Sequence, residues 1–143
     1  MAHALLIQHF LPLLSKAEGR IVSLTSLGAG FSLSGGIQFK DVHTDQAKMA
    51  PLLAGYFRYG QSKLANILYA RALAKHHPEI TSLAVHPGLV KTELNMNRGY
   101  VDKQFIKISS WMTGTVMIAP EEGIKNQLWA ATVKKEDMTN GSW

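Results

Sequence analysis

The sequence predicts an α/β fold in which two neighbouring strands pair in parallel through an intervening helix. The prediction rests on an apolar segment with near-helical spacing at residues 3–15, a long helical segment at residues 56–77, and two short β-rich runs at residues 20–26 and 80–85. A strand, a helix and a second strand in this order form a crossover, and crossovers join parallel neighbours of one sheet. We therefore expect a parallel sheet with helices packed against it.

The composition is that of a globular protein. The chain has 143 residues, of which 46% are hydrophobic and 17% charged, and it contains no cysteine. This length fits a single domain, and the lack of cysteine excludes disulfides, thiolate metal sites and a cysteine nucleophile. The net charge of +5 comes from scattered residues. A nucleic-acid-binding domain would rest on that charge alone, so we expect no nucleic-acid partner.

The first helix is expected over residues 3–15, where apolar residues recur at near-helical spacing. Pro12 is expected to kink or shorten this helix, because proline lacks a backbone N–H. The strand at residues 20–26 follows and ends in Thr25 and Ser26. It therefore delivers two hydroxyl side chains to its carboxyl end.

The apolar N-terminal stretch does not have the features of a membrane span or a secretory leader. Residues 4–14 include Gln8, His9 and Pro12, and the stretch is too short to cross a bilayer. It also lacks the basic leader and the small-residue cleavage site of a signal peptide. We therefore expect no transmembrane segment, and together with the lack of cysteine the sequence favours a cytoplasmic setting.

The middle of the chain predicts a long loop, a helix and a strand. Residues 27–55 are rich in Gly, Ser and Asp and show no clean period, so we expect a long excursion with little regular structure. The second helix is expected over residues 56–77, and Pro78 ends it because proline disfavours helix at the preceding residue. The second strand covers residues 80–85, and the His-Pro-Gly sequence at 86–88 stops it.

The C-terminal part carries weaker patterns. Residues 105–118 fit either a lobe over a pocket or a packed helix. The Pro-Glu-Glu sequence at 120–122 marks a helix start, since proline suits the first turn and acidic groups favour the helix N-terminus. We expect this helix over residues 120–133, and its expected buried stripe consists of Ile124, Leu128 and Ala131. The sequence at 140–142 matches a glycosylation sequon, which we interpret as a chance match.

Tyr59 and Lys63 are the strongest candidates for chemistry. They lie four residues apart on the second predicted helix and therefore share one face. A free phenol titrates at a pH of about 10, and an adjacent ammonium lowers the phenol pKa by favouring the phenolate. The spacing alone is a weak motif, because a solvated lysine often lies near a core tyrosine by chance. Ser26 and residues 86–88 strengthen it, since ligands of α/β folds bind at the carboxyl ends of strands.

With these segments together the sequence resembles the short-chain dehydrogenase/reductase family. The resemblance is carried by residues 19–26 with the sequence Gly-Arg-Ile-Val-Ser-Leu-Thr-Ser, by Tyr-Gly-Gln-Ser-Lys-Leu-Ala-Asn at 59–66, and by His-Pro-Gly-Leu-Val-Lys-Thr at 86–92. The long spacing between Ser26 and Tyr59 and the segment at 39–41 are similar to the retinol-dehydrogenase and WW-domain-oxidoreductase branch. The resemblance implies that residues 1–143 form one partial domain, the catalytic C-terminal part of a Rossmann-like doubly wound parallel sheet.

The resemblance also implies a role for each matching residue. Tyr59 would be the general acid or base, Lys63 would lower the Tyr59 pKa and bind the nicotinamide ribose, and Ser26 would donate to the substrate oxygen. The implied cofactor-binding residues are Tyr59, Lys63, Pro87, Gly88, Val90 and Thr92. We expect NADP(H) in preference to NAD(H), a carbonyl or alcohol substrate, and a homo-oligomer. We expect no metal site, since the adjacent His76 and His77 would point to different faces.

Two interpretations of the function remain open. Members of the family begin with a strand, a Gly-rich turn and a helix that hold the pyrophosphate, and these 143 residues contain no such βαβ unit, because residues 28–30 lack the third glycine. No asparagine matches the family's catalytic one. The chain is therefore either part of an NAD(P)-dependent oxidoreductase that transfers hydride to or from a carbonyl or alcohol, or a truncated, inactive paralogue whose first two helices form a dimerisation or interaction module.

Overall fold

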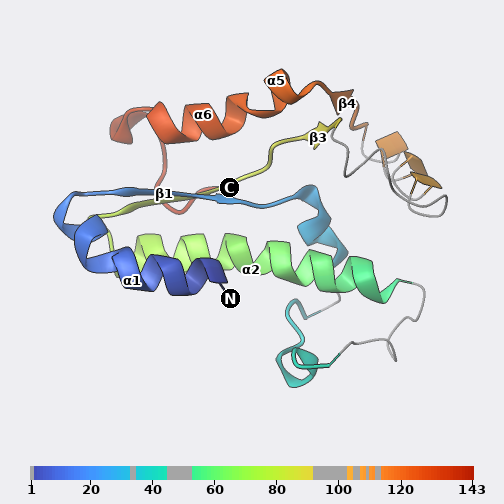
Figure 1. The fold of residues 1–143 in the computed structure, drawn as a ribbon, viewed down its shortest axis with the longest axis horizontal. Helices are drawn as coiled ribbons and strands as arrows, with labels where there is room; N and C mark the ends of the chain where they lie inside the picture. The colour runs from blue at the N-terminus through green and yellow to red at the C-terminus, as the bar shows by residue number, and fades with distance from the viewer. Residues whose placement is uncertain are drawn as a thin grey trace.

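A small parallel sheet lies between helices in the structure (Figure 1). The computed structural model describes residues 2–32, 35–44, 53–91, 103–104, 107–108, 110–111 and 114–143. The elements in chain order are α1 (Ala2–Lys16), β1 (Arg20–Leu24), η1 (Leu27–Phe31), η2 (Phe39–Asp41), α2 (Ala54–His76), β2 (Thr81–Val85), β3 (Leu89–Val90), β4 (Met117–Ile118), α5 (Pro120–Gly123), α6 (Lys125–Thr132) and η3 (Lys135–Asp137). α2 packs on one face of the sheet and α6 on the other.

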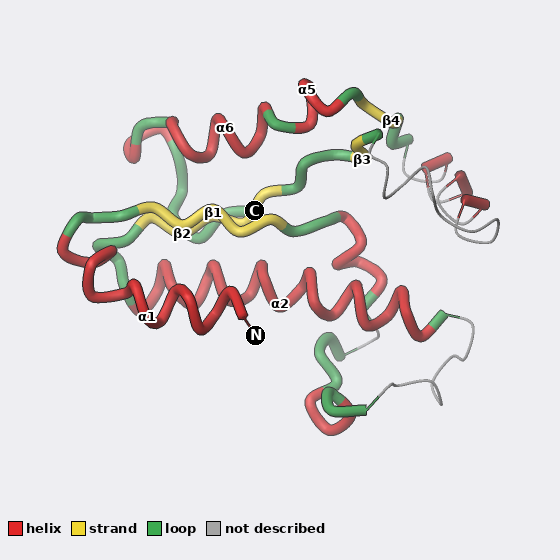
Figure 2. The backbone as a smooth tube through the Cα atoms, in the orientation of Figure 1, coloured by secondary structure: helices red, strands yellow, loops and turns green. Residues whose placement is uncertain are grey.

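β1 and β2 pair in parallel, as predicted, and α2 is the crossover between them. The register runs from Arg20 beside Thr81 to Leu24 beside Val85, so the strands are aligned over their whole length (Figure 2). β1 is two residues shorter than the predicted strand. Ser26 therefore lies just beyond the strand, at its carboxyl end.

The edge of β2 that faces away from β1 is covered by residues 140–142. The Gly141 N–H donates to the Ser82 carbonyl at 2.9 Å. The Asn140 side chain accepts from the Ser82 N–H at 2.8 Å through Oδ1, and donates to the Ile80 carbonyl at 2.8 Å through Nδ2. This segment acts as a third, irregular strand, and β2 is buried between its two neighbours.

β1 occupies the opposite edge of the sheet. Alternate residues of a parallel strand bond to the same neighbour, and the Gly19 carbonyl and the Thr25 N–H both bond to β2. The backbone groups of Arg20, Val22 and Leu24 therefore face outward. Within the described part of the chain, β2 is the strand that pairs with β1, and no strand pairs with this outward edge.

α2 supplies most of the core. Ile67 and Ala70 are buried in a cluster with Ala29 of η1 and Ala84 of β2, and Leu64 packs against this cluster. The predicted helix at 56–77 is thus confirmed with bounds shifted by one or two residues. Its buried side faces the sheet and η1, which fixes the first half of α2 beside the carboxyl end of β1.

α1 runs unbroken from Ala2 to Lys16 and passes through Pro12, so the expected shortening at this proline is wrong. A proline removes only its own N–H, and the neighbouring turns of the helix keep their hydrogen bonds. None of the described α1 residues is buried. The apolar side chains that it exposes, by 49 to 65%, are Leu5, Leu6, Phe10 and Leu13.

The predicted helix at 120–133 consists of two helices, α5 and α6, separated at Ile124. The predicted buried stripe is wrong. Ile124 and Leu128 are 58% and 60% exposed, and Ala131 is exposed as well. The residues that this segment buries are Gly123 and Ala130.

Close approach to the sheet explains why small residues occupy this buried side. A Cβ on Gly123 would lie 2.5 Å from Val90 Cγ2, so a larger residue would push α5 away from β3. At the other end, the Arg20 guanidinium donates to the Ala130 carbonyl at 2.7 Å and to the Val133 carbonyl at 2.6 Å. The start of β1 therefore anchors the C-terminal end of α6, where a positive charge is favourable.

The long excursion predicted at 27–55 contains two short 3₁₀ turns, η1 and η2, and residues 33–34 and 45–52 lie outside the described part. The segment predicted as a lobe or a packed helix at 105–118 also lies largely outside it. At its end, β4 pairs in parallel with β3. No helix among the described residues is long and apolar enough to cross a membrane.

Candidate active site

Ser26 lies at the turn that leads from β1 into η1. Its side chain caps η1, where Oγ accepts a hydrogen bond from the Gly28 N–H at 3.0 Å. A hydroxyl has one proton and two lone pairs. Because the Gly28 N–H takes one of the lone pairs, the Ser26 proton remains available to donate to a further group.

A glycine contact brings Ser26 close to Tyr59. A Cβ on Gly28 would lie 2.7 Å from Tyr59 Cε1 and 3.3 Å from Ser26 Oγ. Likewise, a Cβ on Gly60 would lie 2.8 Å from the Gly28 carbonyl oxygen and 2.9 Å from the Ser32 nitrogen. η1 therefore packs backbone against backbone on α2, which places the hydroxyl of Ser26 and the ring of Tyr59 beside the same glycine.

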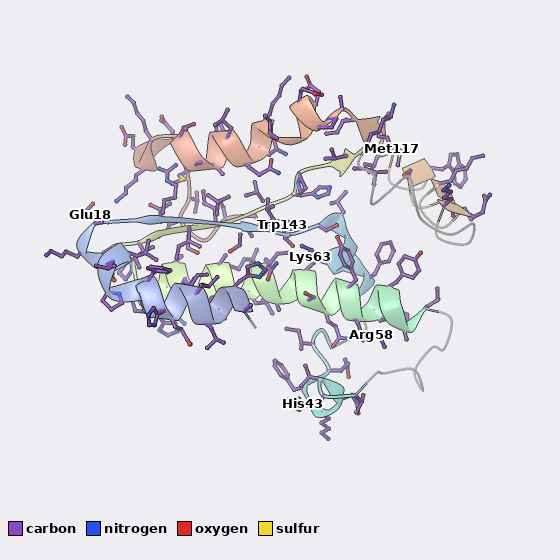
Figure 3. The ribbon with its side chains drawn as sticks, viewed as in Figure 1. Glu18, His43, Arg58, Lys63, Met117 and Trp143 are labelled. Atoms are coloured by element: carbon purple, nitrogen blue, oxygen red, sulfur yellow. The ribbon has the colours of Figure 1, made fainter. Side chains whose placement is uncertain are left out.

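Lys63 projects from α2 toward the end of β1 (Figure 3). Its ammonium donates to the Leu24 carbonyl at 3.2 Å and lies 5.8 Å from the centre of the Tyr59 ring. The Asn66 side chain donates to the same carbonyl at 2.9 Å. Thr25 is almost fully buried and donates from Oγ1 to the Lys63 carbonyl at 2.8 Å. The strand end and α2 are thus joined by three hydrogen bonds at the level of Lys63.

The structure brings Ser26, in the turn between β1 and η1, close to Tyr59 and Lys63 of α2. The Tyr59 side chain is open to a ligand, since the residue is 46% exposed. A phenol and a hydroxyl beside one glycine form a pair of donors that can act on one oxygen atom, and an ammonium lies near the phenol ring. Such an arrangement suits proton transfer to a carbonyl oxygen or from an alcohol.

Pro87, Gly88 and Val90 follow β2 and leave the sheet at the same end as Ser26, because Leu24 and Val85 are in register. Gly88 has a φ of +85°, which favours glycine, and a Cβ there would also lie 2.7 Å from Ile118 Cδ1. Thr92, the last predicted cofactor residue, lies outside the described residues. In the described part of the chain, no group of three or more His, Asp or Glu residues is placed to hold a metal ion.

His86 precedes this turn and is partly buried. Burial lowers the pKa of its imidazole, because the charged form loses hydration. Its Nδ1 is buried and finds no hydrogen-bond partner among the described residues. The His86 carbonyl accepts from Asn126 Nδ2 at 2.8 Å, which ties the turn to α6.

Sequence reasoning missed the residues that hold the site together, namely Thr25 as a link to Lys63, Asn66, Gly28 and Gly60. Asn66 and Gly60 adjoin the Tyr59 and Lys63 motif, so their nearness to the site could have been inferred from helical spacing. The contact between Gly28 and Gly60 could not, because it depends on how two distant segments pack.

The chain is similar in sequence to known proteins. No known family profile matches the chain. It is 32% identical to the short-chain dehydrogenase/reductase drtF of Aspergillus calidoustus over 91% of its length, and 30% identical to retinol dehydrogenase 14 of Homo sapiens over 100% of its length. It spans less than half of these relatives, 44% and 41% of their respective lengths.

A solved structure shares the fold. Salutaridine reductase from Papaver somniferum matches 96% of this chain with a TM-score of 0.60 and 22% sequence identity, and the match covers 49% of that reductase. The chain therefore has the fold of part of a Rossmann-like α/β domain, as predicted.

The glycine contact predicts that Gly28→Ala destabilises the fold. The new methyl group has to displace either the Tyr59 ring or η1, so we expect the free energy of unfolding to fall by about 1–3 kcal/mol in urea titrations. Gly30→Ala is the matched control, because a Cβ at Gly30 meets no atom within 4 Å. Both variants gain the same backbone rigidity, so equal stabilities would contradict the contact.

The lowered pKa of His86 predicts a loss of stability in mild acid. Above a pH of about 6.5 the imidazole is neutral in both the folded and the unfolded chain. Below it the unfolded chain binds a proton that the buried imidazole resists, so the free energy of unfolding should fall as the pH decreases. Urea titrations at pH values of about 7.5 and 5.5 measure this fall, and it should be smaller in His86→Gln. An equal fall in both proteins would assign the effect to other histidines.

Proposed function

Because the chain belongs to the short-chain dehydrogenase/reductase family, we propose that it carries the proton-transfer site of a nicotinamide-dependent oxidoreductase acting on a carbonyl or an alcohol. The observation that carries the proposal is that Ser26 and Tyr59 both lie beside Gly28, with the Lys63 ammonium 5.8 Å from the centre of the Tyr59 ring. The relatives named above are oxidoreductases about twice as long as this chain. We extend their activity to this chain as part of the proposal.

In the proposed reduction, Tyr59 donates its phenolic proton to the carbonyl oxygen of the substrate. The exposed position of the ring lets a substrate reach the hydroxyl. Ser26 donates its proton to the same oxygen in a hydrogen bond, because its bond from the Gly28 N–H uses one lone pair and leaves the proton available. The Lys63 ammonium, close to the ring, stabilises the phenolate that remains after proton donation. In the oxidation of an alcohol, Tyr59 takes the proton back.

The described residues fit only the nicotinamide end of the cofactor. When bound, the nicotinamide supplies or accepts the hydride. We propose that Lys63 binds the ribose next to the nicotinamide and that Tyr59 lies beside this ribose. The nicotinamide ring would be lined by Pro87, Gly88 and Val90, and by Thr92, which lies outside the described residues. The described α-helix N-termini carry no Gly-rich turn that could hold a pyrophosphate. The preference for NADP(H) and a cytoplasmic setting remain predictions from the sequence.

A second candidate function rests on α1. Its four exposed leucine and phenylalanine side chains form an apolar surface of the kind that marks an interaction site. The proposed homo-oligomer would bury this surface, and an inactive paralogue could serve as an interaction module through it. Activity measurements on a fusion of this chain with the cofactor-binding half of a family relative distinguish this candidate from the enzyme.

We predict that Tyr59→Phe abolishes nearly all carbonyl reduction in a fusion that joins the cofactor-binding half of a family relative to this chain. The ring stays and only the proton donor is lost, so the circular dichroism spectrum and unfolding midpoint should not change. Ser26→Ala should mainly lower kcat, whereas Lys63→Ala should also raise the KM for NADPH. Gln8→Ala, on exposed α1, is the control and should retain activity. An active fusion that tolerates Tyr59→Phe would refute the assignment.

For the chain alone we predict no saturable binding of NADPH at micromolar cofactor, together with oligomers on size exclusion. We expect weak binding because the described residues are proposed to contact only the nicotinamide end of the dinucleotide. We expect oligomers because the outward edge of β1 and the apolar surface of α1 favour self-association. Calorimetry and light scattering measure the two properties. A monodisperse monomer that binds NADPH tightly would contradict both expectations.

A further inference from the structure

Asn140 and Gly141 form the one Asn-Gly pair of the sequence, because the other asparagines precede Ile67, Met96, Arg98 and Gln127. An asparagine followed by glycine is open to an internal reaction in which the next backbone nitrogen attacks the side-chain carbonyl carbon. Glycine permits this reaction, since it has no side chain to hinder the approach and allows backbone angles closed to other residues. The pair is therefore a candidate for spontaneous modification.

The fold uses both residues of this pair. The amide of Asn140 takes the place of a peptide group, with Oδ1 bonded to the Ser82 N–H and Nδ2 bonded to the Ile80 carbonyl. Gly141 has a φ of +80°, and a Cβ there would lie 3.1 Å from the Ala74 Cβ. The segment therefore depends on the amide at 140 for pairing with β2, and the conformation at 141 favours glycine.

The same hydrogen bonds hold the reacting atoms apart. The Gly141 N–H points to the Ser82 carbonyl at 2.9 Å. The side chain of Asn140 is held at both of its polar atoms at 2.8 Å, so its carbonyl carbon cannot rotate onto the Gly141 nitrogen without breaking two bonds. Pairing with β2 therefore blocks the attack, and release of the segment permits it.

We propose that Asn140 is a deamidation site controlled by the pairing of residues 140–142 with β2. In the released segment the Gly141 nitrogen forms a bond with Asn140 Cγ, the bond from Cγ to Nδ2 breaks, and ammonia leaves with the Gly141 amide proton. Water then opens the resulting cyclic imide at one of its two carbonyls. The products are aspartate or isoaspartate, and the net change is the uptake of one water and the loss of one ammonia.

The product pairs poorly with β2. A carboxylate at 140 can still accept from the Ser82 N–H, but it cannot donate to the Ile80 carbonyl, and its charge lies beside that oxygen. Isoaspartate also lengthens the backbone, which shifts Gly141 and Ser142 away from Ser82 and Ala84. Deamidation thus converts a transient release of the segment into a permanent one and uncovers an edge of the buried strand β2.

The first test compares deamidation rates in the full chain, folded in buffer and unfolded in urea. Trypsin cleaves after Lys135, and mass spectrometry of residues 136–143 detects the replacement of NH₂ by OH. Deamidation should be at least about tenfold slower in the folded chain, because only the open fraction reacts. The peptide that begins at Asn126 is the internal reference and should react slowly in both samples. Equal rates at Asn140 in the two samples would overturn the proposal.

The second test uses Asn140→Asp as a mimic of the aspartate product and follows amide hydrogen exchange. Ser82 and Ala84, whose amides face residues 140–142, should exchange at least about tenfold faster than in the parent chain. The amides of Leu83 and Val85, which face β1, should change little. Thr139→Asp places the same charge one residue before Asn140, next to the hydrogen bonds that join residues 140–142 to β2, and should leave all four amides protected. Unchanged exchange at Ser82 and Ala84, or equal acceleration of all four amides, would overturn the proposed release.

Discussion

η1 and α2 touch through two glycines, and the geometry of the candidate site depends on this contact. Without a side chain on Gly28 or Gly60, the backbone of η1 reaches the backbone of α2. Ser26 caps η1 and Tyr59 precedes Gly60, so the same contact brings the two functional side chains together. The buried bond from Thr25 to the Lys63 carbonyl extends the link by one turn of α2. A methyl group at either glycine would separate the two groups that we propose act on one substrate atom.

The parallel sheet determines which segments lie near this contact. β1 and β2 are parallel, so Ser26 and the turn at 86–88 leave the same end of the sheet. β2 is covered on both edges, by β1 and by residues 140–142, whereas β1 has a neighbour on one side only within the described residues. Arg20 holds the start of β1 to the end of α6. The strand that is covered on both edges, β2, thus leads into the turn at 86–88, which we propose lines the cofactor. Ser26 follows β1, the strand with one neighbour among the described residues.

The elements of the fold could largely be predicted from the sequence, because a buried strand or a long helix imposes a local period. The face that a helix turns inward was harder to predict. Ile124 and Leu128 have the period of a buried stripe, yet Gly123 and Ala130 lie inward because α5 and α6 approach β3 and β1 closely. The spacing of Tyr59 and Lys63 predicted a candidate site, but the contact with Gly28 depends on the packing of segments far apart in sequence.

The contacts described above for the proposed proton-transfer groups join segments of this chain. Ser26 accepts from the Gly28 N–H, Lys63 bonds to the end of β1, and Tyr59 lies beside Gly28. The proposed cofactor site is different, because we propose residues for its nicotinamide end alone, and the chain spans less than half of the two relatives named above. The geometry of proton transfer can therefore form before the dinucleotide is held. In the function that we propose, the activity of a fusion with the cofactor-binding half of a relative would then depend on how the cofactor is supplied to a site that is already arranged.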